Sequence, residues 1–154
     1  MSEKWYQELR VANRIKDSLG RQNCQIVEFI ERKSECSYKI VAEKSSSLRI
    51  IVEVRGYPLK KIESYKGKGK TRSAAEINDQ AKKWFADALL ELSIERSKDP
   101  FKVEPIKIIA FGLPDLDIYR NLINDINYVR RKLALSCYFV KEDDSMEEVN
   151  PVNP

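Results

Sequence analysis

Apolar and polar residues alternate most regularly along residues 48–55, LRIIVEVR, and this pattern predicts a β-strand that ends before Gly56. Side chains of a strand point alternately to its two faces. Glu53 and Arg55 therefore share one face, while apolar side chains occupy the other. The strand presents an acid and a guanidinium group side by side on one face.

Two further strands are predicted upstream, and they cover residues 25–32 and 38–44. A short turn at residues 45–47 joins the second of them to the Glu53 strand. If Lys44 lies opposite Leu48 across this turn, Lys39 lies directly across from Glu53 on the same face of the sheet. A slip of one residue would separate the two side chains, because it turns every side chain to the other face.

Three segments show helical periodicity, and they cover about residues 3–19, 74–92 and 116–129. Ser2 can cap the first helix, and Gly20 ends it. Ser73 and Glu76 form a capping box at the start of the second helix. The third helix begins at an aspartate after the turn GLP.

Two apolar runs at residues 106–111 and 134–140 complete the pattern. A continuous apolar run is typical of a buried parallel strand. The order is therefore helix, three strands, helix, strand, helix, strand. A three-strand meander followed by α-β units predicts an α/β protein with a mixed central sheet flanked by helices.

Composition narrows the classes of protein and of chemistry. The chain has 154 residues, of which 42% are apolar and 34% charged, as expected for a soluble globular domain. It shows neither a membrane-spanning run nor the apolar core of a signal peptide, so we expect a cytoplasmic protein without a membrane partner. There is no histidine, and the three cysteines lack Cys-x-x-Cys spacing. Histidine-based catalysis is excluded, and a zinc site or disulfide framework is not expected.

The charge is distributed unevenly along the chain. The formal net charge is +4, but the last 14 residues hold five acids and one lysine, so the first 140 residues carry +8. We expect one domain over residues 1–141 and a disordered acidic tail over residues 142–154. The positive charge of residues 1–140 is compatible with binding to the phosphates of nucleic acid.

Residues 60–72 form a basic segment that is the best candidate for contacts to nucleic acid. The candidate side chains are Lys60, Lys61, Lys66, Lys68, Lys70 and Arg72. The GKGKT sequence in this segment invites comparison with a phosphate-binding P-loop, but Ser64 stands where that motif requires its first glycine. We therefore interpret the segment as a flexible basic loop.

The Glu-x-Arg spacing at Glu53 and Arg55, together with the element order, resembles the PD-(D/E)xK (restriction-endonuclease-like) nuclease superfamily. The resemblance spans roughly residues 3–141. It implies an αβββαβ core with one added αβ unit. Members of this superfamily are magnesium-dependent DNA phosphodiesterases, so the resemblance also implies DNA as a partner.

Residues of the superfamily's site can be matched one by one. Glu53 matches the motif's metal-binding Glu, and Arg55 stands at its catalytic Lys. Glu8 matches a further metal-binding Glu on the first helix, while Gln80 with Trp84 resembles the Gln-x-x-x-Tyr of one branch. The resemblance thus assigns metal binding to Glu8 and Glu53, and catalytic positions to Glu53, Arg55 and Gln80.

Lys39 occupies the position at which the superfamily carries a metal-binding Asp. At about 4 Å an ammonium group would repel a divalent ion by about 8 kcal/mol near a protein surface. Arg55 cannot usefully deprotonate a water molecule. Our hypothesis is that Lys39 pairs with Glu53 and takes the metal's place, which leaves a degenerate site with weak or no phosphodiesterase activity.

Several alternatives remain open at this stage. The chain could be an active magnesium-dependent DNA endonuclease with a migrated ligand such as Glu43, although that residue faces Arg49 in the proposed register. It could instead be a protein–protein interaction domain, with Lys39 and Glu53 forming an ordinary cross-strand pair. Trp84 can equally be a core residue, Glu8 a surface residue and Gln80 a stripe-edge residue. A homodimer is also compatible with the sequence.

Overall fold

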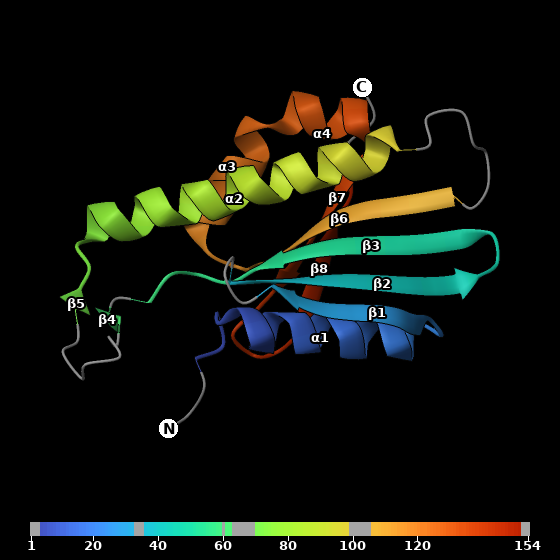
Figure 1. Cartoon of the computed structure of the whole chain (residues 1–154), viewed down its shortest axis with the longest axis horizontal. Coiled ribbons are helices and arrows are strands. Elements are labelled where there is room, and N and C mark those ends of the chain that lie inside the picture. The colour runs from blue at the N-terminus through green and yellow to red at the C-terminus, as the bar shows by residue number, and fades with distance from the viewer. Residues whose placement is uncertain (1–3, 33–35, 60, 63–69, 99–105, 152–154) are drawn as a thin grey trace.

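The computed structural model describes residues 4–32, 36–59, 61–62, 70–98 and 106–151 (Figure 1). The elements of the first half are α1 (Glu8–Arg21), β1 (Gln25–Arg32), β2 (Ser37–Ser45), β3 (Leu48–Arg55), β4 (Lys61–Ile62) and β5 (Lys70–Thr71). The elements of the second half are α2 (Ala74–Ser97), β6 (Ile106–Pro114), α3 (Asp117–Asp125), α4 (Asn127–Leu133), β7 (Leu135–Val140) and β8 (Met146–Val149).

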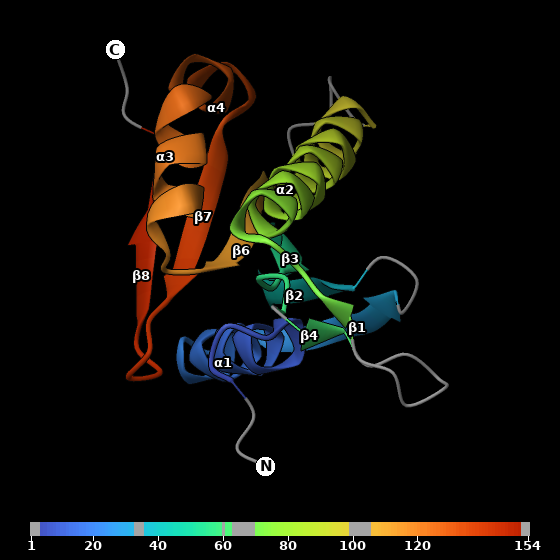
Figure 2. The same cartoon turned by 90° about the vertical axis from the view of Figure 1, so that its left-hand side faces the viewer.

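The described residues form an α/β structure built on a mixed sheet of six strands, in the order β1-β2-β3-β6-β7-β8. The first three strands are antiparallel, β3, β6 and β7 are parallel, and β8 returns antiparallel to β7. Helix α1 covers one face, and α2 lies with α3 on the other (Figures 1 and 2). The predicted α/β class and mixed sheet flanked by helices are confirmed.

The register between β2 and β3 agrees with the prediction at Lys39 and Glu53. Lys39 is the direct partner of Glu53. The turn itself differs, because Ser45 rather than Lys44 lies opposite Leu48, and an irregularity after Glu43 absorbs the extra residue. Side chains along the rest of the hairpin therefore point to the predicted faces.

Alternation along the central strands produces a separate core on each face of the sheet. One core packs α1 against side chains such as Val52 and Val54. The other packs α2 and α3 against β6 and β7, and it includes Phe85, Phe111 and Tyr119. Within the described ranges, no helix combines the length and the apolar character needed to cross a membrane.

The acidic tail is ordered over most of its length, so the expectation of disorder is wrong for residues 142–151. Strand β8 pairs with β7, and Met146 packs against the α1 core. In the turn before β8, the carboxylate of Asp144 lies 3.1 Å from Arg10 and 3.0 Å from Arg14 of α1. The two guanidinium groups compensate one of the five acids that suggested a solvated tail. Residues 152–154 lie outside the described part.

Candidate functional site

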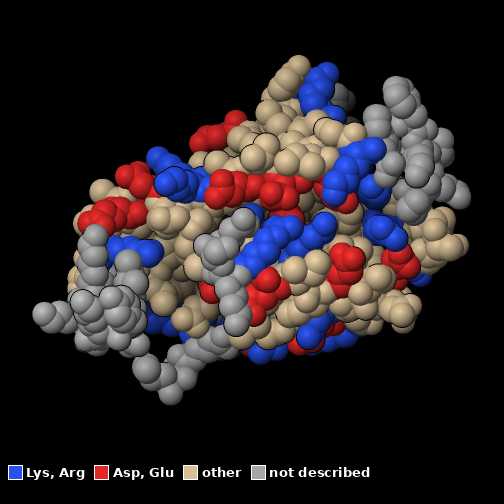
Figure 3. Space-filling model, in the orientation of Figure 1, with Lys and Arg blue, Asp and Glu red and all other residues tan. Residues whose placement is uncertain are grey.

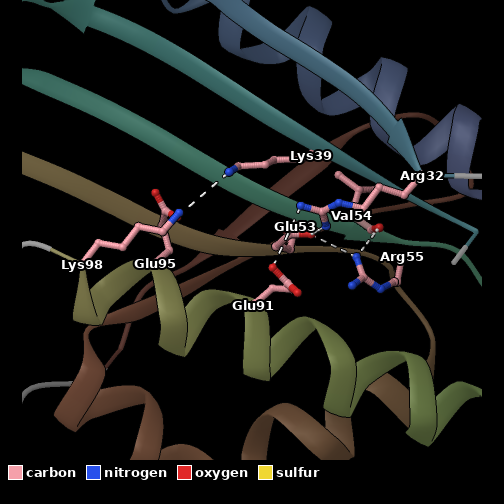
Figure 4. Close-up of polar contacts among 8 residues, drawn as sticks. All are labelled: Arg32, Lys39, Glu53, Val54, Arg55, Glu91, Glu95 and Lys98. Carbon is pink, nitrogen blue, oxygen red and sulfur yellow. Dashed lines mark hydrogen bonds and ion pairs between the residues drawn. The ribbon is translucent and has the colours of Figure 1, made fainter.

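Glu53 is buried against two arginines rather than exposed to a metal (Figure 4). It is 3% exposed, and its Oε2 accepts hydrogen bonds from Arg32 Nη1 at 2.8 Å and from Arg55 Nη1 at 3.2 Å. Arg55 is itself only 1% exposed, and its Nη1 also donates to the carbonyl of Val54. A single carboxylate oxygen thus compensates two guanidinium groups, of which Arg55 is buried and Arg32 is partly exposed.

Arg32 is the site residue that the sequence analysis missed. It ends the edge strand β1 opposite Ser37, which in turn lies opposite Arg55. The small Ser37 side chain between them leaves room for Arg32 to reach diagonally across β2 to Glu53. The sequence does show a basic residue at the end of QIVEFIER. Only the register of β1 against β2, however, reveals that this residue lies on the same face as Glu53 and close to it.

Lys39 does not pair with Glu53, so the predicted ion pair is wrong although the register is right. Lys39 Nζ instead lies 4.0 Å from Glu95 Oε2 on α2, and Lys98 lies 2.8 Å from the same oxygen (Figure 4). Burial by itself would raise the pKa of Glu95, but the hydrogen bond from Lys98 and the charge of Lys39 outweigh burial and hold that pKa below its ordinary value. The Glu53 carboxylate, which Lys39 was expected to contact, accepts a hydrogen bond from Arg32 instead.

A second acid on α2 completes a continuous polar cluster between the sheet and this helix. Glu91 lies 4.0 Å from Arg32, one helical turn before Glu95. We call this group the Glu53 cluster, and its members are Arg32, Lys39, Glu53, Arg55, Glu91 and Glu95. The cluster ties three strands to α2 through ion pairs.

Glu8 lies at the end of β3 and does not join the cluster as a metal ligand. A Cβ added to Gly56 would lie 2.9 Å from the Glu8 carboxylate and 2.5 Å from the Glu8 backbone nitrogen, so the N-terminal segment crosses closely over Gly56. The Tyr57 amide fixes this crossing by donating to the Tyr6 carbonyl at 2.9 Å. Partial burial and the nearby Glu8 charge raise the pKa of the Cys36 thiol.

Gln80 lies on the N-terminal half of α2, where it lines an open cavity of about 500 Å³. The other lining side chains are Arg72, Glu76, Asp79, Lys82 and Lys83. Of the predicted nucleic-acid contacts, only Arg72 has a described side chain. The backbones of Lys61 and Lys70 belong to the short β4–β5 hairpin, while Lys60, Lys66 and Lys68 lie outside the described residues.

Charged side chains of both signs alternate on the face that carries the Glu53 cluster. Figure 3 shows a row of acidic side chains along α2 directly beside lysine and arginine side chains at the sheet. This distribution favours internal ion pairs over a uniform basic field. The described residues therefore place no broad positive patch on this face.

The residues present do not fit a magnesium ion. Magnesium requires oxygen ligands, commonly two carboxylates, without competing cations. Glu53 has two arginines in contact instead, and its direct cross-strand partner is a lysine, Lys39. Across the described residues, no three Asp, Glu or Cys side chains converge in an arrangement that could hold a metal ion.

Fold and site together define an α/β domain with a cluster of ion pairs beside its central strand, in which Glu53 and Arg55 are buried. No model of a known protein family matches this chain. A search of curated proteins finds no relative either. Conclusions about function therefore depend on the geometry described above.

Proposed function

We propose that this chain is a nucleic-acid-binding domain built like a restriction-endonuclease-like nuclease but unable to hydrolyse its ligand. The observation that carries the proposal is the contact of two guanidinium groups with Glu53, the acid that a nuclease of this kind would give to its metal. The order of a helix, a three-strand meander, a second helix and a parallel strand supports the resemblance.

Guanidinium groups can replace the charge of a metal ion but not its chemistry. They compensate Glu53 and attract phosphate oxygens through directed N–H donors. They do not lower the pKa of a bound water as a divalent ion does, and an arginine stays protonated at neutral pH, so Arg55 cannot act as a general base. Binding without cleavage is the function that these residues support best.

Nucleic acid is the partner favoured by the charge of the chain body and by the basic segment 60–72. Arg72 ends this segment and lies in the cavity on α2 together with Lys82 and Lys83. At about 500 Å³ the cavity falls within the range of small-ligand sites, which suits a nucleotide unit. The cavity lining carries three basic side chains, Arg72, Lys82 and Lys83, against two acids, Glu76 and Asp79.

Salt-dependent binding tests the nucleic-acid part of the proposal. Fluorescence anisotropy with single-stranded and duplex DNA and RNA should show an affinity that falls linearly with the logarithm of salt concentration. Arg72→Ala should weaken binding and reduce the slope by about one. Arg21→Ala, at the exposed end of α1, is the matched control and should change neither value. Absence of binding to all four nucleic acids would refute this part and favour a protein-interaction domain.

Metal titration tests the absence of hydrolysis. Calorimetry with Mg²⁺ and Mn²⁺ should show no binding to the wild type, and DNA should remain uncut in either ion. Cleavage that Glu53→Ala abolishes would refute the proposal and restore an active endonuclease. The double variant Arg32→Ser with Lys39→Asp should gain metal binding, because it removes one guanidinium from Glu53 and supplies a second acid.

A further inference from the structure

We infer that strand β1 pairs with β1 of a second copy of this chain, antiparallel and about a two-fold axis at Ile30, so that the two sheets become continuous. Strand β1 is one of the two outer strands of the six-stranded sheet, and among the described residues it pairs with β2 alone. Its outward-pointing backbone groups are therefore available to another strand. In Figure 2, β1 lies at the end of the sheet away from β8, and α1 lies beneath the sheet.

Strand β1 lacks the residues that commonly protect the edge of a sheet from pairing. Its eight residues, QIVEFIER, include neither proline nor lysine, whereas the other outer strand, β8, has only four residues. Two apolar side chains of β1 are exposed, Val27 by 47% and Ile30 by 43%. A long outer strand with exposed apolar side chains favours the addition of a further strand.

The irregularity of β1 determines where two copies overlap. The pairing with β2 shifts between Ile26 and Glu28, so the regular part of β1 is residues 28–32, and Ile30 is its centre. A two-fold axis perpendicular to the sheet makes both copies present the same surface and keeps each side chain on its own face. Placed at Ile30, this axis makes the two regular segments overlap completely and brings the two exposed Ile30 side chains together.

Charge complementarity selects the same register. With the axis at Ile30, Glu28 lies opposite Arg32 of the other copy, and Glu31 lies opposite Phe29. Neither acid then meets another acid. An axis at Glu28, Glu31 or Arg32 would place two identical charges directly opposite each other, which destabilises a strand pair. An axis at Phe29 would place Glu28 against the apolar Ile30.

Lys16 of α1 supplies a partner for Glu31 of the second copy. Its Nζ lies 4.8 Å from the centre of the Phe29 ring, which packs against the α1 core, and Glu31 lies on the same face because it pairs with Tyr38 of that core. Residues directly opposite in an antiparallel pair have Cβ atoms about 4.5 to 5.5 Å apart, so Glu31 of the second copy comes close to this ammonium group. Within one copy, and among the described residues, neither Lys16 nor Glu31 forms a salt bridge. The two-fold axis creates this ion pair twice.

Disulfide trapping tests the register. Directly opposite residues of an antiparallel pair have Cα atoms about 4.5 to 5.5 Å apart, a distance that a disulfide can span. Ile30→Cys should therefore form a covalent dimer on mild oxidation, in a background where Cys36→Ser removes the native cysteine that is not buried. Glu28→Cys is the matched control, because it lies on the same face but its two copies would be about 13 Å apart along the strands. Equal crosslinking of the two variants, or none of Ile30→Cys, would overturn the inference.

Charge reversal tests the pairing without a crosslink. Sedimentation velocity over a concentration series should show the wild type associating from one copy to two. Glu31→Lys places a positive charge beside Lys16 of the other copy and should weaken association about ten-fold or more. The double variant Glu31→Lys with Lys16→Glu should restore association, because the two charges exchange places. Glu148→Lys, the same change at an exposed position of the other outer strand, is the control and should associate like the wild type.

The outcomes separate loss of pairing from loss of folding. Glu31→Lys should keep the melting temperature of the wild type under dilute conditions, because this exposed side chain forms no salt bridge with the described residues of its own copy. A wild type that remains a single copy at every concentration would overturn the inference. Unchanged association of Glu31→Lys, or a double variant that associates no better than Glu31→Lys alone, would overturn it as well. None of these measurements involves nucleic acid, so their results are independent of the proposed function.

Discussion

Replacing Glu53 with glutamine distinguishes an acid that compensates buried arginines from an acid kept for a metal. The change leaves Arg55, which is 1% exposed, without its carboxylate partner. Removing one partner of a buried ion pair typically costs about 3 to 5 kcal/mol, because the remaining charge stays buried and uncompensated. Arg32 is 25% exposed on its side chain and can recover water, so most of the loss comes from Arg55.

Urea denaturation of Glu53→Gln should therefore show a loss of about 3 to 5 kcal/mol in the free energy of unfolding, with an unchanged dependence on urea concentration. Glu43→Gln is the matched control, since that carboxylate pairs with Arg49 at 2.7 Å in the same hairpin but both side chains are 35 to 40% exposed. Its cost should stay below about 1 kcal/mol. Equal stability of the two variants, or a gain for Glu53→Gln, would refute the assignment of Glu53 as a structural counter-ion.

Three further predictions concern the surroundings of the site. Gly56→Ala should lower the free energy of unfolding by about 2 kcal/mol in urea denaturation, because the added Cβ would lie 2.5 Å from the backbone nitrogen of Glu8. Gly20→Ala on α1 is the control: its Cβ would meet no atom within 4 Å, so it should raise the free energy of unfolding by about 0.5 to 1 kcal/mol. The hydrogen bond from Arg120 lowers the pKa of Asp115 from 3.8, so Asp115→Asn should cost about 1 kcal/mol at neutral pH. That difference should vanish as the pH falls through the lowered pKa, and a constant difference across an acid titration would contradict it. Asp144→Asn removes the charge but keeps a residue type that tolerates the φ of 69° at this position. It should lower the free energy of unfolding by about 1 kcal/mol at low salt and by less at high salt. An effect that salt does not change would refute the ion pairs with α1.

The spacing of apolar residues along the chain predicted the α/β arrangement, because this spacing reflects which side chains each helix or strand buries. Val52 and Val54 of β3 lie in the α1 core while Glu53 and Arg55 are buried on the opposite face, and the capping box at Ser73 begins α2 as expected. The tail could not be predicted in the same way. Strand β8 has only four residues, of which two are acidic. Its position depends on Asp144, which contacts Arg10 and Arg14, residues more than a hundred positions away.

The part of the candidate site that depends on the pairing of two neighbouring strands could be predicted from the sequence. The assumed turn placed Lys39 opposite Glu53, and the structure has this pairing because the irregularity after Glu43 compensates for the different turn. Which cation reaches the carboxylate depends on a third strand, since Arg32 enters from β1 and leaves Lys39 to the acid on α2. Competition between two basic residues for one acid is decided by side-chain length and direction, which a single strand pair does not reveal.

The short strand β8 closes the side of the sheet that β7 would otherwise leave open. Its two central residues, Glu147 and Glu148, carry like charges, and an identical strand brought alongside would meet them with the same charge. A chain shortened to end at residue 141 would uncover the unpaired backbone of a strand whose six residues are all buried in the intact protein. Such a chain should self-associate through β7, so proteolytic removal of the residues after 141 would expose a template for aggregation.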